Sequence, residues 1–200
     1  MKQNVAENIE EQRNNLRNYF LNIAPKTNVD DLNELLDQFT LDKFSKKQLL
    51  YKAGGVSDTL YFIYRGLLRI YYIKEDKEIT NLFVPENQIV IGAYSILTGE
   101  RNYSNYEAFE DTYVLKLKYS VMEEYYLKYH SLEHLGRKLV ERYYTSYMKK
   151  TYDVLFLSAE ERYQIFMKEQ SDLMNRVPLR YIASYLGIKQ ETLSRLRAKY

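Results

Sequence analysis

The sequence predicts an α+β protein: N-terminal helices, an antiparallel β-roll, one long helix and a C-terminal helix-turn-helix. Short β-prone runs fill residues 41–118, and residues 119–156 contain a single glycine and no proline. Two short helical patterns separated by a glycine lie within residues 157–200. Hydrophobic periodicity and turn residues are the primary signals for such assignments. We therefore divide the chain into residues 1–40 (N-terminal helices), 41–118 (β-roll sensor), 119–156 (dimerisation helix) and 157–200 (helix-turn-helix domain).

The composition is that of a folded chain in a reducing compartment. The sequence is 46% hydrophobic and contains no cysteine, which excludes disulfides, thiolate zinc sites and iron–sulfur clusters. Its start is polar, with acidic residues interspersed, and no run approaches membrane-spanning length. We expect a cytoplasmic protein that does not associate with membranes.

Two helices are expected before the β-roll. Apolar residues recur at helical spacing from Val5 to Ile23, and a second helix opens after Pro25 with Asp30 and Asp31 in its first turn. Carboxylates there interact favourably with the helix dipole. The second helix is expected to bury Leu32, Leu35, Leu36 and Phe39.

The β-roll prediction rests on short runs such as LYFIY, LLRIYYI, ITNLFV and TYVLKL. Turn signals separate them, among them Gly54-Gly55 and Glu75-Asp76. Many short strands at regular spacing favour an antiparallel roll or barrel.

The stretch from residue 119 to 156 is predicted to be one continuous helix with an apolar seam. A small β-domain cannot cover so long a helix, so the seam is expected to pair with its own copy across a twofold axis. The predicted dimer-interface residues step by three or four: Tyr129, Leu132, Gly136, Val140, Tyr143, Tyr147 and Thr151.

A helix-turn-helix is predicted at the C-terminal end. Ser158 and Glu161 form a capping-box pattern that starts a new helix. Further on, Pro178 stands at a helix start and Gly187 ends that helix after two turns, with a second short helix following at once. The apolar residues that would face each other across the turn are Ile182, Ala183, Leu186, Ile188, Leu193 and Leu196.

Basic charge is concentrated in this segment. Residues 173–200 contain six basic residues and one acidic residue, Glu191, whereas the whole chain carries only +2. This pattern is typical of a polyanion-binding module, although a solvated face on a helical hairpin is the alternative. Lys189 occupies the cap position of the second helix, where a DNA phosphate could supply the missing anion. The predicted DNA-binding residues are Arg180, Lys189, Gln190, Glu191, Thr192, Ser194, Arg195, Arg197 and Lys199.

These segments resemble the Crp/Fnr family of bacterial regulators. GIKQETLSR, residues 187–195, is similar to the family's recognition helix, and the preceding RVPLRYIASYLG is similar to its first helix. Glu191 and Arg195 match the family's base-reading positions, whereas Gln190 stands where the best-known members have arginine. The resemblance extends from about residue 16 to the end and is greatest for short members that end after the recognition helix. It implies a cyclic-nucleotide-binding-like roll, a homodimer on a near-palindromic operator in double-stranded DNA, and RNA polymerase as a candidate partner.

The resemblance also indicates a degenerate cyclic-nucleotide motif. Gly92 is kept, but Ala93 replaces the family's glutamate, and Asn102 and Tyr103 stand where its Arg-Ser pair would be. Arg101 lies one residue away, so a cyclic nucleotide remains an alternative to an unknown small-molecule effector, and tyrosine rings filling the space remain another. The residues assigned to the effector pocket are Phe83, Gly92, Ala93, Tyr94, Arg101, Asn102 and Tyr103.

We expect no enzymatic activity, cofactor or metal. No glycine-rich phosphate loop, GxSxG elbow or HExxH motif is present, and residues 41–118 lack the histidines that a cupin-type metal enzyme needs. His130 and His134 share a helix face without an evident third metal ligand, and they are the only histidines available to a haem. The remaining rival to a DNA-binding regulator is an effector-binding regulatory subunit that acts through protein contacts.

Overall fold

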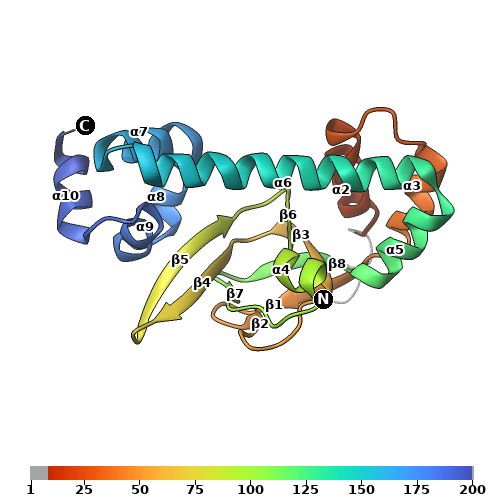
Figure 1. The fold of residues 1–200 in the computed structure, drawn as a ribbon, viewed down its shortest axis with the longest axis horizontal. Coiled ribbons are helices and arrows are strands. Elements are labelled where there is room, and N and C mark those ends of the chain that lie inside the picture. Colours follow the sequence, from red (N-terminus) through yellow and green to blue (C-terminus); the bar gives the residue numbers. More distant parts are fainter. Residues whose placement is uncertain (1–8, 200) are drawn as a thin grey trace.

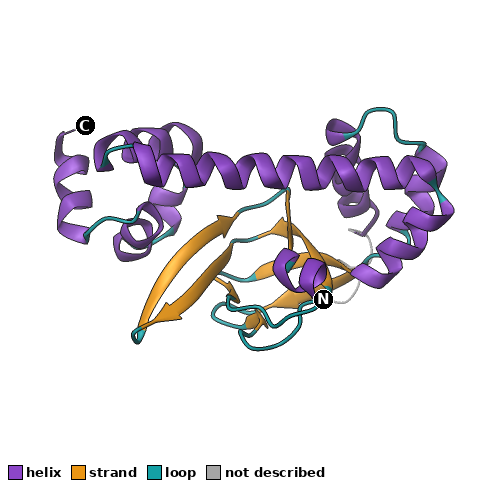
Figure 2. Cartoon of the chain, in the orientation of Figure 1, coloured by secondary structure: helices purple, strands orange, loops and turns teal. Residues whose placement is uncertain are grey.

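The computed structural model describes residues 9–199 (Figures 1 and 2), so Val5 lies outside the described residues. The helices are α2 (Ile9–Ile23), α3 (Val29–Leu36), α4 (Ala93–Thr98), α5 (Tyr119–Lys128), α6 (His130–Phe156), α7 (Ala159–Gln170), α8 (Leu173–Arg176), α9 (Leu179–Leu186) and α10 (Gln190–Lys199). The strands are β1 (Thr40–Phe44), β2 (Leu49–Tyr51), β3 (Thr59–Arg65), β4 (Leu68–Lys74), β5 (Lys77–Val84), β6 (Gln88–Ile91), β7 (Asn105–Ala108) and β8 (Thr112–Lys118). No helix of this part of the chain is long and apolar enough to span a membrane.

The β-roll is confirmed, and so is the predicted fold class. Two antiparallel four-stranded sheets, in the orders β1-β8-β3-β6 and β2-β7-β4-β5, face each other. Residues from both inner faces fill the space between them, as in other sheet-on-sheet packings. This cluster includes Ile63 and Val114 from the first sheet and Leu68, Ile70 and Tyr106 from the second. The roll therefore has a packed interior.

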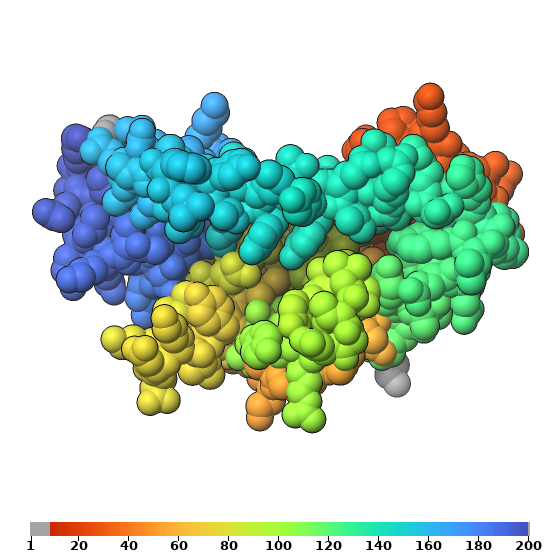
Figure 3. All heavy atoms as spheres, in the orientation of Figure 1, coloured from red at the N-terminus to blue at the C-terminus, as the bar shows by residue number. Residues whose placement is uncertain are grey.

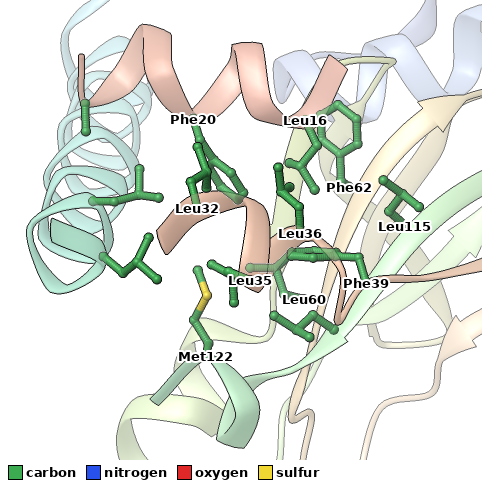
Figure 4. Packing of buried hydrophobic residues seen from close by; sticks show 14 residues of the cluster. Leu16, Phe20, Leu32, Leu35, Leu36, Phe39, Leu60, Phe62, Leu115 and Met122 are labelled. Atoms are coloured by element: carbon green, nitrogen blue, oxygen red, sulfur yellow. The ribbon is translucent and has the colours of Figure 1, made fainter. Parts of the chain in front are cut away.

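The N-terminal helices cover one end of the roll. Asn28 caps α3 by accepting hydrogen bonds from the backbone N–H groups of Asp30 and Asp31. Figure 4 shows Leu16 and Phe20 of α2 packed on Leu32 and Leu36 of α3, with Phe62 and Leu115 of the roll beside them. In Figure 1 this cluster lies at one end of α6, and the C-terminal helices lie at the other.

The prediction of a single helix over residues 119–156 is wrong in one respect, because the helix is interrupted at Tyr129. That residue is extended (φ −131°, ψ 109°) and separates α5 from α6. Its hydroxyl donates to Glu34 of α3 at 2.6 Å, while the Lys128 ammonium lies 4.6 Å from its ring centre. The break lets α5 fold back onto α6, where a Cβ at Gly136 would come within 2.5 Å of the Tyr126 ring.

The C-terminal segment begins with the predicted capping box. The Glu161 backbone N–H donates to Ser158 Oγ at 3.2 Å, and the Ser158 N–H donates to Glu161 Oε2 at 2.8 Å. Leu157 is extended, so α6 ends at Phe156 and α7 starts in a new direction. Residues 157 and 158 therefore separate two distinct helices, α6 and α7.

Candidate nucleic-acid interface

Helices α9 and α10 form the predicted helix-turn-helix. Gly187 closes α9 with left-handed backbone (φ 66°), and the Ile188 N–H donates to the Ala183 carbonyl at 3.0 Å. This left-handed cap is the role in which glycine is favoured. Ile182, Ala183, Leu186 and Leu193 are all buried, together with Tyr163, Phe166, Leu173 and Val177 from the preceding segment. The apolar face of α10 is thus fixed against α9 and α7.

The opposite face of α10 is open. Gln190, Glu191, Ser194 and Arg195 are exposed, and Thr192 is half-buried. Within the described residues, no side chain forms a hydrogen bond or ion pair with Gln190, Ser194 or Arg195. Positions 190, 191, 194 and 195 follow helical spacing, so one stripe presents amide, carboxylate, hydroxyl and guanidinium groups side by side.

Lys189 immediately precedes α10, and its side chain has no atom that can accept hydrogen bonds from the first backbone amides of the helix. The Leu193 N–H bonds to its carbonyl at 3.1 Å, which identifies it as the cap residue. The remaining N-terminal amides of α10 and the exposed Lys189 ammonium therefore point to the same end of the helix. This arrangement suits an anion such as a phosphate.

Two of the C-terminal cations are already paired. Arg176 donates to Glu86 at 2.9 and 3.0 Å and also to Glu110, so it joins the C-terminal helices to the β-roll. Burial acts to raise the pKa of Glu86, but its hydrogen bonds, chiefly from Arg176, hold that pKa below its usual value. The Lys199 ammonium lies 2.7 Å from Glu160 of α7. Arg180, Lys189, Arg195 and Arg197 remain exposed.

The seam of α6 starts later than predicted. Leu132 is fully buried and Gly136 packs on Tyr126, so neither can contact a second copy. Tyr129 lies at the helix break. Val140, Tyr143 and Tyr147 have 53%, 53% and 61% of their area exposed, and Thr151 is exposed too. Four more exposed side chains nearby were not predicted: Tyr144, Tyr152, Leu155 and Phe156.

These exposed residues all lie on α6, which runs along the surface of the molecule. Figure 3 shows the side chains of α6 as a continuous band on one side of the molecule. An exposed apolar surface of this kind usually marks an interface. We name the residues Val140, Tyr143, Tyr147, Thr151 and Val154 the α6 seam.

The predicted effector pocket is wrong in including Phe83. This ring is 3% exposed and packs on Tyr185 of α9 and on Phe109, with ring centres 5.6 and 6.2 Å apart. It therefore belongs to the contact between the roll and the C-terminal helices. The physical reason is that β5 passes beside α9 and contacts it (Figure 1).

The other pocket residues lie around α4 and the loop that leads to β7. The rings of Tyr94 and Tyr103 are 5.8 Å apart and largely exposed, as is Arg101. Asn102 is buried, and its side-chain amide donates to the Tyr106 hydroxyl at 3.3 Å. Burial raises the pKa of Tyr106 to about 12. The Tyr106 ring thus lies in the interior beside Asn102.

The two histidines lie near the start of α6. His130 Nδ1 is 3.3 Å from Glu133, and His134 Nδ1 is 2.9 Å from Arg137. Among the described residues, no group of three or more histidine, aspartate or glutamate side chains could hold a metal ion.

A half-buried lysine lies where α6, β5 and α9 meet. Lys150 donates to the backbone carbonyl of Asn81 and to its side-chain oxygen, and its ammonium is 4.5 Å from the Tyr185 ring centre. Its neighbour Lys149 instead pairs with Glu169 at 2.5 Å. Burial lowers the pKa of Lys150 to about 8, against its usual 10.5.

This pKa predicts a pH-dependent stability. Below pH 8 the folded and unfolded states both hold the proton, so the full cost of burying the charge is present. Between pH 8 and 10.5 Lys150 has lost its proton in the folded state but still holds it in the unfolded state. The free energy of unfolding should therefore rise with pH over this range. We expect Lys150→Met to add about 1 kcal/mol at pH 7 and to flatten this rise, measured by urea unfolding at pH 7 and 9.5. Lys149→Met is the matched control, and a less stable Lys150→Met with an unchanged pH slope would contradict the assignment.

Comparisons with known proteins agree with this architecture. The family model described as "Cyclic nucleotide-binding domain" matches residues 41–129. The fumarate and nitrate reduction regulatory protein of Vibrio cholerae is 24% identical over 192 residues, covering 88% of this chain and 73% of that protein. The anaerobic regulatory protein of Haemophilus influenzae is 24% identical over 189 residues, covering 86% and 70%.

Solved structures share the fold. FixK2 from Bradyrhizobium japonicum has a TM-score of 0.68 at 19% identity, covering 80% of this chain and 83% of that one. A CooA mutant from Carboxydothermus hydrogenoformans has a TM-score of 0.65 at 19% identity, covering 83% and 78%. The c-di-GMP-responsive regulator CLP of Xanthomonas campestris has a TM-score of 0.64 at 15% identity, covering 86% and 91%. Each of these similarities covers four-fifths or more of this chain, which is more than the roll alone.

Proposed function

We propose that this chain is a Crp/Fnr-type regulator, as its similarity to curated regulators and solved structures supports, and that it is a sequence-specific, DNA-binding transcription regulator that acts as a homodimer. One observation carries this proposal. The apolar face of α10 is buried on α9 and α7, while its polar face is exposed and has cations at both ends. A helix held in this way can enter the major groove without unfolding any part of its own domain.

The exposed stripe of α10 supplies the base contacts. Arg195 suits the acceptor edge of guanine, Gln190 suits adenine, and Glu191 accepts from cytosine. Ser194 can serve either role, and Thr192 lies at the border of the stripe. Because Gln190 replaces an arginine of the best-known relatives, the half-site should differ from theirs.

Phosphate contacts come from the flanking cations. Lys189 and the N-terminal amides of α10 lie at one end of the reading helix, Arg197 at the other, and Arg180 in the first turn of α9. Lys199 is a weaker candidate than the sequence predicts, because Glu160 already neutralises it. These contacts fix register, whereas the stripe reads sequence.

The α6 seam is the proposed dimer contact. Two copies joined by a twofold axis along this helix would place two reading helices one turn of DNA apart, about 34 Å, on a near-palindromic site. An effector at the α4–β7 loop would act by binding one arrangement of the C-terminal helices more tightly than another. RNA polymerase is the partner expected of a bound regulator.

Salt dependence tests the proposal directly. A DNA reader releases counterions, so the logarithm of its affinity falls steeply with the logarithm of salt concentration. We expect Arg197→Ala to weaken binding to all duplexes alike and to reduce this slope by about one, and Lys199→Ala to reduce it by less. The measurement is fluorescence anisotropy at several salt concentrations. A flat salt dependence would overturn the proposal in favour of a subunit that acts through protein contacts.

A further inference from the structure

The first helix of the helix-turn-helix is bonded to an edge of the β-roll. Strand β5 is the outer strand of its sheet, so outward N–H groups there lack a strand partner. Ser184 of α9 supplies one: the Thr80 N–H donates to Ser184 Oγ at 2.9 Å. Because buried backbone donors need partners, this hydrogen bond fixes the position of α9 along β5.

A buried arginine lies at the centre of the same contact. Arg69 of β4 is 1% exposed, and its guanidinium lies 4.3 Å from the Tyr71 ring centre and 4.2 Å from that of Tyr181. Tyr71 belongs to the roll, whereas Tyr181 belongs to α9. The charge is therefore held between one ring from each part of the molecule.

The polar contacts of Arg69 all come from the roll. Its Nε donates to Thr80 Oγ1 at 3.0 Å, and Nη1 is 2.7 Å from Glu78 Oε2. Its Nη2 is buried without a hydrogen-bond partner. A guanidinium in that state is stabilised by aromatic faces, so the Tyr181 ring is what α9 contributes.

Apolar and charged contacts surround this centre. Tyr181 also packs on Phe109 with ring centres 5.3 Å apart, and Tyr185 packs on Phe83. Leu67 and Phe83 of the roll share one buried cluster with the core of the C-terminal helices. The ion pairs of Arg176 with Glu86 and Glu110 lie at one side of this contact. The contact is built like a core, unlike the mobile contacts usual between domains.

We propose that Arg69 is a positioning residue that sets the direction in which the DNA-reading face points. The reasoning rests on the proposed function. Helix α10 follows α9 through the Gly187 cap, so the direction of α9 determines that of the reading stripe. The extended Leu157 separates α6 from α7, so the two helices do not form one continuous helix. Removing the Arg69–Tyr181 contact should let the C-terminal helices turn about that break.

The test uses the full chain, which has no native cysteine, with spin labels at Lys52→Cys and Ala198→Cys. Both positions are exposed, one on the roll and one on α10. Labelled protein is diluted with unlabelled protein, and the distance distribution is measured by double electron–electron resonance. We expect one narrow distribution in the parent and a broadened one in Arg69→Met. Arg65→Met, an exposed arginine of β3, is the matched control and should stay narrow.

A second variant and a DNA measurement complete the test. If Arg69→Met fails to unfold cooperatively, Tyr181→Leu removes the same contact from the other side and must broaden the distribution. Operator affinity should fall about tenfold if a tenth of the molecules keep the reading orientation. A narrow distribution in the folded variants overturns the role of Arg69. A parent that binds no DNA overturns the proposed function, while the distance distributions still judge the contact.

Discussion

Tyr147→Glu should convert the protein to a monomer and reduce its affinity for the operator by at least roughly a hundredfold, because one half-site alone loses the effective concentration that the second provides. The Tyr147 side chain is 61% exposed in the middle of the α6 seam. Across a twofold axis the new carboxylate would approach its own copy and be buried without a cation. Light scattering after size-exclusion chromatography measures the mass, and anisotropy titration measures the affinity.

The control places the same charge elsewhere on α6. Thr145 is exposed and lies two residues before Tyr147, about 200° around the helix. Thr145→Glu should remain dimeric and bind as the parent does. A Tyr147→Glu protein that is still dimeric and still binds tightly would show that the α6 seam is not the dimer contact.

Arg195→Ala should lower the preference for one base pair in each half-site by about 1–3 kcal/mol. Arg195 is exposed on the same stripe as Glu191, and no other described side chain holds it. Its guanidinium is therefore free to pair with O6 and N7 of guanine. The measurement compares the affinity for the operator with that for the three duplexes in which this base pair is replaced by each of the others.

Arg197→Ala is the matched control for that experiment. It removes a neighbouring guanidinium from the last turn of the same helix, so it should weaken the operator and its single-base variants by the same factor. If Arg195→Ala also lowers affinity for operator and random DNA equally, Arg195 contacts a phosphate and the base assignment is wrong.

The parts of the fold that follow local rules could be predicted from the sequence. The Ser158–Glu161 capping box and the Gly187 cap appear where their sequence signatures place them. The short β-prone runs of residues 41–118 form the strands of the roll for the same reason, since β-branched and aromatic runs separated by turn residues are typical of strands. The resemblance to the Crp/Fnr family is confirmed as well.

The errors arose where distant residues decide the structure. The break at Tyr129 has no glycine or proline to announce it, and its hydroxyl partner, Glu34, is 95 residues away. The sequence places Phe83 in an effector pocket, whereas the structure packs it on Tyr185 of α9. These two residues are far apart in the chain, so their contact leaves no local pattern in the sequence.

The contacts of two arginines also depend on distant residues. Arg176 is one of the six basic residues of the C-terminal segment, but Glu86 and Glu110 of the roll bind it. Nothing in the sequence around Arg69 indicates that Tyr181 covers it. Such pairs become visible only when the chain is folded.

Selection of bound duplexes from a random DNA pool tests the central claim most directly. The full chain is incubated with the pool, bound duplexes are recovered, and the recovered sequences are read over several rounds. We predict enrichment of an inverted repeat whose half-sites lie about one helical turn apart, with a half-site altered at the position that Gln190 faces. Recovery of sequences no different from the starting pool would contradict the assignment of this protein as a sequence-specific DNA-binding regulator.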